Sequence, residues 1–74
     1  MKVTGRINIW FADRNYGFIH QNLNGVVVKH FLHASNILSG VPQKGLTASF
    51  DTIQSEKGAV ARNVEILDGG GNRD

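Results

Sequence analysis

The sequence predicts a small all-β protein in which five short strands form a closed or nearly closed barrel. Short runs of apolar, β-branched and aromatic residues recur along the chain, and turn-forming residues separate them. No segment has the apolar period of a helix long enough for an α/β unit. With 74 residues and no cysteine, the chain has room for one domain, which its hydrophobic core must stabilise without disulfides.

The first three strands are expected close together in the chain, with polar turns between them. Residues 3–11 alternate between apolar and polar side chains in their second half, and residues 16–20 carry aromatic or imidazole rings at every other position. Residues 26–33 are rich in β-branched and aromatic side chains. The polar run 12–15 and the turn-forming run 21–25 connect these strands.

The second half of the chain supplies the remaining two strands. A single helical turn is expected at residues 34–38, before a loop that contains the only proline. Residues 46–53 have apolar side chains at alternate positions, and the polar loop 54–58 separates them from the apolar strand 59–66. These two strands complete the expected barrel.

The barrel domain is expected to span residues 1–67, and residues 68–74 to form a flexible glycine-rich tail or linker. The net charge is +2, but residues 1–50 hold five of the eight basic side chains and one of the six acidic ones. The first half is therefore the expected anion-facing side. The chain has neither an apolar run of about 20 residues nor a signal-peptide pattern. We therefore expect no membrane partner and a monomeric, cytoplasmic protein, which could be one module of a longer chain.

The two faces of the first three strands differ in chemistry. One face is aliphatic apart from one histidine and comprises Ile7, Ile9, Ile19, Val28, His30 and Leu32. The other face combines rings with polar or charged groups and comprises Arg6, Asn8, Trp10, Tyr16, Phe18, His20, Lys29, Phe31 and His33. Burying this second set would cost about 1–3 kcal/mol for each polar group without a partner. The aliphatic face is therefore expected to point inward.

The outward face, together with Arg14, has the groups that a single-stranded nucleic acid requires. Aromatic rings stack on bases, at about 1–3 kcal/mol per base, while lysine and arginine neutralise phosphates. A duplex, whose bases are already stacked, is expected to bind less well. The expected partner is single-stranded RNA or DNA, without a cofactor or a small-molecule substrate.

Other interpretations of the same residues remain open. The rings could extend the core, or they could dock a partner protein, because exposed apolar patches also mark such sites. A metal site is disfavoured, since His30 lies on the opposite face from His33 and no cysteine or carboxylate accompanies the histidines. We expect no enzyme, because the chain lacks a carboxylate pair within one motif, an oriented nucleophile and a phosphate loop.

Four segments resemble the bacterial cold-shock proteins and the cold-shock domains of Y-box proteins. Arg14–Ile19 resembles the family's Lys-Gly-Phe-Gly-Phe-Ile segment, and His30–His33 resembles its Val-Phe-Val-His segment. These are the family's two ribonucleoprotein motifs. Gly5–Phe11 aligns with the opening Gly-x-Val-Lys-Trp-Phe-Asn, and Lys57–Val64 resembles the closing Lys-Gly-Pro-x-Ala-x-Asn-Val.

The resemblance implies a five-stranded antiparallel barrel of the oligonucleotide-binding (OB) fold that binds single-stranded RNA or DNA. In the family this activity serves RNA chaperones and regulators of transcription or of later steps. By position, the stacking residues would be Tyr16, Phe18, Phe31 and His33, and Lys57 would contact phosphate. The alternative is an OB-fold module that uses the same aromatic face to bind a protein.

Several positions depart from the family pattern. Ile9 occupies the family's Trp position and Trp10 the neighbouring Phe position, although strand alternation still predicts an outward Trp10 if the first strand has no bulge. Lys29 replaces an Asp, and Ala34 stands where bacterial members carry a stacking Phe. The loop after Ile37 contains no aromatic residue. With fewer rings, the expected footprint is about 4–7 nucleotides, toward the low end for one such barrel.

Overall fold

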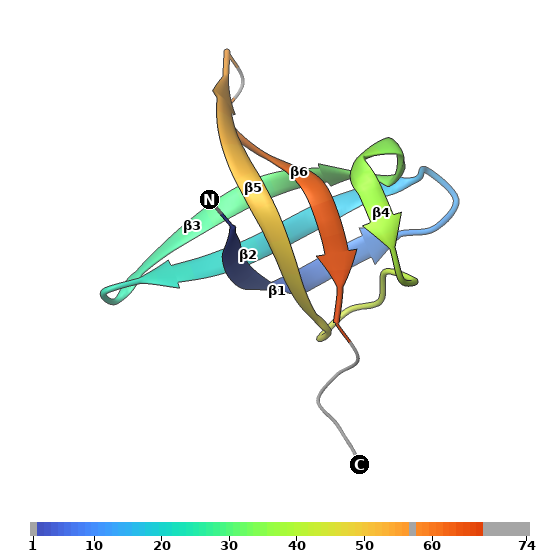
Figure 1. Ribbon diagram of the computed structural model, residues 1–74, viewed down its shortest axis with the longest axis horizontal. Coiled ribbons are helices and arrows are strands. Elements are labelled where there is room, and N and C mark those ends of the chain that lie inside the picture. Colours follow the sequence, from blue (N-terminus) through green and yellow to red (C-terminus); the bar gives the residue numbers. More distant parts are fainter. Residues whose placement is uncertain (1, 57, 68–74) are drawn as a thin grey trace.

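The computed structural model describes residues 2–56 and 58–67, so Lys57 and the expected tail at 68–74 lie outside the described residues. In chain order the elements are β1 (Val3–Phe11), β2 (Tyr16–Leu23), β3 (Val26–His33), the 3-10 turn η1 (Ala34–Asn36), β4 (Ile37–Ser39), β5 (Thr47–Ser55) and β6 (Gly58–Ile66) (Figure 1). The three-residue η1 is the only helical segment in this part of the chain, and no described helix could cross a membrane.

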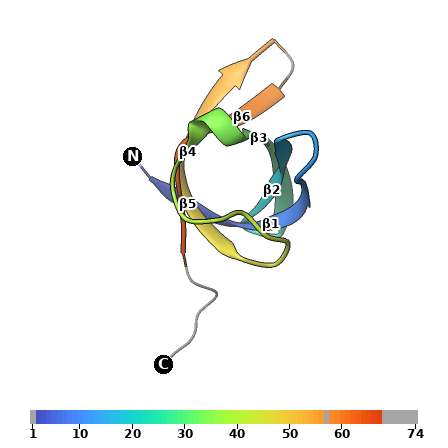
Figure 2. The ribbon, with the colours of Figure 1, turned by 90° about the vertical axis from the view of Figure 1, so that its right-hand side faces the viewer.

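Five of the strands close into a barrel, as the sequence predicts. Antiparallel pairs join them in the order β3, β2, β1, β5 and β6, and a parallel pairing of Phe31 with Val60 closes the ring between β3 and β6 (Figure 2). The short β4 pairs in parallel with β6 farther along, at Val64 and Glu65. The predicted five-stranded OB barrel is therefore confirmed, although its closing pair is parallel and the helical turn ends at Asn36 rather than at residue 38.

Small and aliphatic side chains from every strand of the barrel fill its interior around one phenylalanine. The buried hydrophobic residues are Ile7, Ile19, Leu32, Ala48, Phe50, Ala61 and Val64. The inward orientation predicted for Ile7, Ile19, Leu32 and His30 is confirmed. Their alternation follows the two-residue period of a strand with one buried face.

A β-bulge in β1 interrupts this alternation. Ile7 pairs with Ile19, but Ile9 pairs with Phe18, so β1 accommodates one extra residue, Asn8, over a single step of β2. Cross-strand partners share a face, and the bulge therefore moves Ile9 to the outer face beside Phe18. The prediction that Ile9 points inward is wrong for this reason.

Trp10 follows the bulge and points the opposite way from the prediction. It pairs with Gly17 and packs, half-buried, against the core. Gly17 permits this approach, because a Cβ at that position would lie 2.8 Å from Trp10 Cε3. The prediction that Trp10 shares the outer face is wrong. Phe11, which pairs with Tyr16, occupies that face instead.

The β2–β3 hairpin is longer than the turn-forming composition of residues 21–25 predicts. Strand β2 continues to Leu23, and the turn itself consists of Asn24 and Gly25, with φ angles of 53° and 88°. Two central residues with positive φ are the signature of a type I′ hairpin turn. Gln21, expected in the turn, is instead a buried strand residue.

Gln21 can be buried because its side chain forms a hydrogen bond with His30. The Nε2 atom of His30 lies 2.9 Å from Gln21 Oε1, and the imidazole packs edge-on against Phe50 with ring centroids 5.0 Å apart. The amide oxygen can only accept, so Nε2 carries the proton of the neutral ring. Nδ1 has no hydrogen-bond partner within the described residues. The polar member of the inward face is thus satisfied by a side chain of the neighbouring strand.

We expect His30→Leu to remove an acid-dependent loss of stability. Burial lowers the pKa of His30, because protonation would add a buried N–H at Nδ1, where no acceptor faces it. The unfolded chain then binds the proton more readily. Stability is therefore complete above the unfolded pKa of about 6.5 and decreases as the pH falls through it toward the folded value.

Urea unfolding at about pH 7.5 and pH 5.0, followed by circular dichroism, measures this difference. Each variant is compared with itself, so the constant cost of leaving Gln21 unpaired cancels. Leu38→Ala truncates an exposed, uncharged side chain of β4, serves as the control and should retain the parent's pH dependence. Asp51, whose pKa is lowered by a hydrogen bond from Asn63, loses its contribution only below this pH range. Identical pH dependence in the parent and His30→Leu would contradict the assignment.

Candidate nucleic-acid interface

The outer face of β1, β2 and β3 presents aromatic side chains in two rows that run across the strands. Cross-strand pairing sets the first row as Phe11, Tyr16 and His33 and the second as Ile9, Phe18 and Phe31. We call the five rings of these rows the aromatic platform: Phe11, Tyr16, Phe18, Phe31 and His33. The placement predicted from alternation on β2 and β3 is confirmed, whereas Phe11 was assigned no role from sequence.

The platform rings hold one another in position. Neighbouring centroids lie 5.2 Å apart for Phe11 and Tyr16, 5.7 Å for Tyr16 and Phe31, and 5.9 Å for Phe18 and Phe31. The rings meet in tilted or edge-to-face arrangements, which aromatic pairs favour. The four rings of Phe and Tyr are half-buried. Packing thus restrains each ring while part of its surface stays open to a ligand.

Lys29 brings a positive charge to the platform. Its Nζ lies 4.9 Å from the ring centroid of Phe18, within the range of a cation–π contact. The side chain is exposed, so such a contact contributes about 0.5–1 kcal/mol. Lys29 also pairs across strands with His20. A stacked base over Phe18 would therefore lie close to a cation that can neutralise its phosphate.

His33 is the last residue of β3, and contacts with Ser35 of η1 orient its imidazole ring. Its Nδ1 accepts a hydrogen bond from the backbone N–H of Ser35 at 3.1 Å and lies 2.9 Å from Ser35 Oγ. Because Nδ1 accepts, the proton of the neutral imidazole is assigned to Nε2. His33 thus adds a donor for a base edge or a phosphate at the exposed end of the platform.

The last residues of β5 and the first residues of β6 form an arm that borders the platform. Phe18 and Phe31 line a hollow of about 390 Å³ together with Ser55, Ala59 and Val60 of this arm. The closing pair between Phe31 and Val60 fixes the arm against β3. These three arm residues carry no signal of a binding site in the sequence, because small and apolar side chains are ordinary in a strand.

The remaining predicted residues lie around the platform. Arg6, His20 and Lys29 are cross-strand neighbours beside the second aromatic row. Asn8 lies in the bulge of β1, between Arg6 and the Ile9 of that row. Arg14 is exposed in the turn between β1 and β2, where its backbone N–H bonds to Phe11 O at 3.0 Å. Lys57 lies outside the described residues. The binding roles of all these side chains stay predictions.

Comparison with known proteins gives the family. A cold shock-like protein of Aquifex aeolicus (strain VF5) is 37% identical over 60 residues, which cover 78% of this chain and 86% of that protein. The chain belongs to the cold-shock domain family. The expected membership of this family is thereby confirmed. The segments compared above with the family's two ribonucleoprotein motifs, Arg14–Ile19 and His30–His33, lie mainly on β2 and β3.

Two longer relatives match this cold-shock domain at 41% identity: Y-box-binding protein 3 of Homo sapiens, over 92% of the chain, and Y-box-binding protein 1 of Xenopus laevis, over 85%. The matches cover 20% and 22% of those proteins. The chain therefore spans about a fifth of the length of these relatives. No protein-family model matches the chain.

Alanine at Trp10 and at Phe11 should separate the core from the platform. Trp10→Ala removes a half-buried, core-packing side chain and should cost about 2 kcal/mol of stability, below the range for a fully buried Trp. Phe11→Ala removes an outer ring and should weaken binding of a labelled oligo-dT by about 1 kcal/mol, close to fivefold. Urea unfolding and fluorescence anisotropy measure the two effects. The reverse pattern, with binding lost in Trp10→Ala and retained in Phe11→Ala, would refute the bulge assignment.

Proposed function

We propose that this cold-shock domain binds single-stranded RNA or DNA by stacking bases on the aromatic platform. The observation that carries the proposal is the gathering of five rings on one outer face, half-buried for four of them, with a lysine beside Phe18. Rings that pack against one another and keep an open surface suit bases, which present a flat apolar face to any stacking partner.

The spacing of the platform also suits an extended strand. The two rows lie two residues apart along β2 and β3, which corresponds to about 6.6–6.8 Å. Consecutive bases can therefore stack on consecutive rows, while the hollow between Phe18 and the β5–β6 arm receives a base edge. Each stacked base contributes about 1–3 kcal/mol with little dependence on its identity. Binding of this kind tolerates many sequences.

Family membership supports nucleic-acid binding as the general activity, and the relatives named for binding a Y-box are in accord with it. A role as an RNA chaperone, or as a regulator of transcription or of later steps, is part of this proposal. Sequence-tolerant stacking on unpaired bases would favour the melted form of an RNA. Lys29, beside Phe18, also favours an anionic ligand over an apolar protein partner.

Phe18→Ala and Phe31→Ala should each weaken binding of oligo-dT and oligo-U about 5- to 150-fold, the equivalent of one lost stacking contact. The measurement is the anisotropy of a labelled seven-nucleotide strand at low salt. Leu38→Ala, which truncates a side chain of β4 that is 62% exposed, is the matched control and should bind as the parent does. Binding of both ring variants at the parent's affinity would refute stacking on the platform.

Salt and strandedness distinguish nucleic-acid binding from the protein-interaction alternative. The logarithm of the affinity should fall with the logarithm of the salt concentration, with a slope of about −0.7 for each phosphate contacted. A duplex of the same length should bind more weakly than the single strand. A parent protein that binds no oligonucleotide at low salt would contradict the proposed function and leave the protein-interaction module as the better account of the platform.

A further inference from the structure

A third row of side chains crosses the outer face next to the aromatic platform, and it is polar. Arg6 of β1 pairs with His20 of β2, which pairs with Lys29 of β3. The row lies two residues along β2 and β3 from Phe18 and Phe31, or about 6.6–6.8 Å. On the other side Arg6 pairs with Thr47, so the polar row extends onto β5. Two rows of rings are thus followed directly by one row of hydrogen-bond donors.

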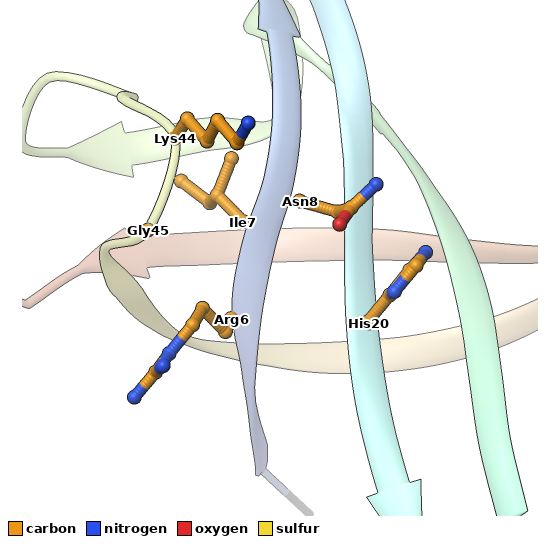
Figure 3. Close-up of a pocket in the computed structure, with 6 residues that line it drawn as sticks. All are labelled: Arg6, Ile7, Asn8, His20, Lys44 and Gly45. Atoms are coloured by element: carbon orange, nitrogen blue, oxygen red, sulfur yellow. The ribbon is translucent and has the colours of Figure 1, made fainter.

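Two adjoining hollows open along this polar row and share Arg6 and His20. The first, of about 210 Å³, is lined by Arg6, Ile7, Asn8, His20, Lys44 and Gly45. The second, of about 320 Å³, is lined by Thr4, Gly5, Arg6, His20, Asn22 and Thr47. In the first hollow Arg6 and Lys44 lie on one side of β1, and Asn8 and His20 lie on the other (Figure 3). We call the two hollows together the polar groove.

Backbone hydrogen bonds fix the loop that carries Lys44 against β1. The N–H of Gly45 donates to Ile7 O at 2.8 Å, and the N–H of Ile7 donates to Leu46 O at 2.8 Å. A further bond from Leu46 N to Gln43 O, at 3.2 Å, closes the loop on itself. Gly45 adopts φ of 93°, a left-handed conformation that suits glycine. Lys44 is therefore attached at the bulge, next to Asn8, through a short hydrogen-bonded turn.

The charges of the polar groove are unopposed among the described residues. Arg6 and Lys44 are exposed, and their side chains form no hydrogen bond or ion pair within residues 2–56 and 58–67. None of the described side chains that line the two hollows is a carboxylate. Lysine and arginine only donate hydrogen bonds, and the amide of Asn8 and the ring of His20 can donate as well. The matching ligand is an anion with several acceptor oxygens.

We propose that Arg6, Asn8, His20 and Lys44 bind the phosphates of a nucleic-acid strand where it leaves the aromatic platform, which lengthens the footprint beyond the bases that stack. This proposal rests on the proposed function, because exposed cations bind isolated phosphates weakly in water. A strand already stacked on the platform raises the local concentration of its own phosphates at the groove. Lys29 lies between the two sites and makes them continuous.

The double variant Arg6→Ala/Lys44→Ala tests the polar groove with oligo-dT strands of two lengths. A four-nucleotide strand, which the platform alone can hold, should bind within about twofold of the parent, whereas an eight-nucleotide strand should bind about 5- to 20-fold more weakly. The salt slope for the longer strand should become shallower by about 1.4, since two phosphate contacts are lost. Lys2→Ala/Arg62→Ala removes the same charge at two positions that line neither hollow and serves as the matched control.

The outcomes separate the groove from the platform. An equal loss for both lengths in the groove variant, or the same loss in the control variant, would overturn the groove and leave the platform intact. Loss at both lengths in Phe18→Ala confirms that the assay reports stacking. If inorganic phosphate at constant ionic strength weakens binding of both strands by the same factor, the groove adds nothing to the longer strand and the groove proposal is wrong. A parent protein that binds neither strand refutes both proposals.

Discussion

The extra residue that β1 accommodates at Asn8 is the constraint on which both sides of this barrel depend. Upstream of it Ile7 faces the core, and downstream of it Trp10 does, three residues later rather than two or four. The indole then packs over Gly17, where any side chain would collide with it and with the backbone of Ile9. At the same time Phe11 moves outward and meets Tyr16. One local irregularity therefore contributes a large side chain to the core and a ring to the platform.

The same region connects the stacking surface with the polar groove. Immediately before the bulge, the backbone of Ile7 forms hydrogen bonds with Gly45 and Leu46 and thereby positions Lys44. After the bulge, Phe11 extends the aromatic rows. Among the described residues the only helical segment is the three-residue η1, so the proposed stacking and phosphate contacts both fall on the outer strand face. The two proposed contact regions follow one another along the same strands.

Uninterrupted alternation made β2 and β3 predictable, and with them Tyr16, Phe18, Phe31 and the buried His30. The face of β1 after Asn8 was not predictable, because Ile9, Trp10 and Phe11 are all apolar and give no pattern from which to detect a bulge. The composition of residues 21–25 indicated a turn and concealed a buried Gln21, whose partner lies nine residues away. Lys44 and the β5–β6 arm join the site only through tertiary pairing, which single-sequence patterns do not encode.

The central claim is that bases stack on the outer rings of β1, β2 and β3, and that Trp10 lies on the other side of the sheet. Intermolecular nuclear Overhauser effects in a complex with a seven-nucleotide oligo-dT test it most directly. We predict contacts from base protons to the rings of Phe11, Phe18 and Phe31, and none to the indole of Trp10. Base contacts to Trp10, without contacts to Phe18 and Phe31, would contradict the account.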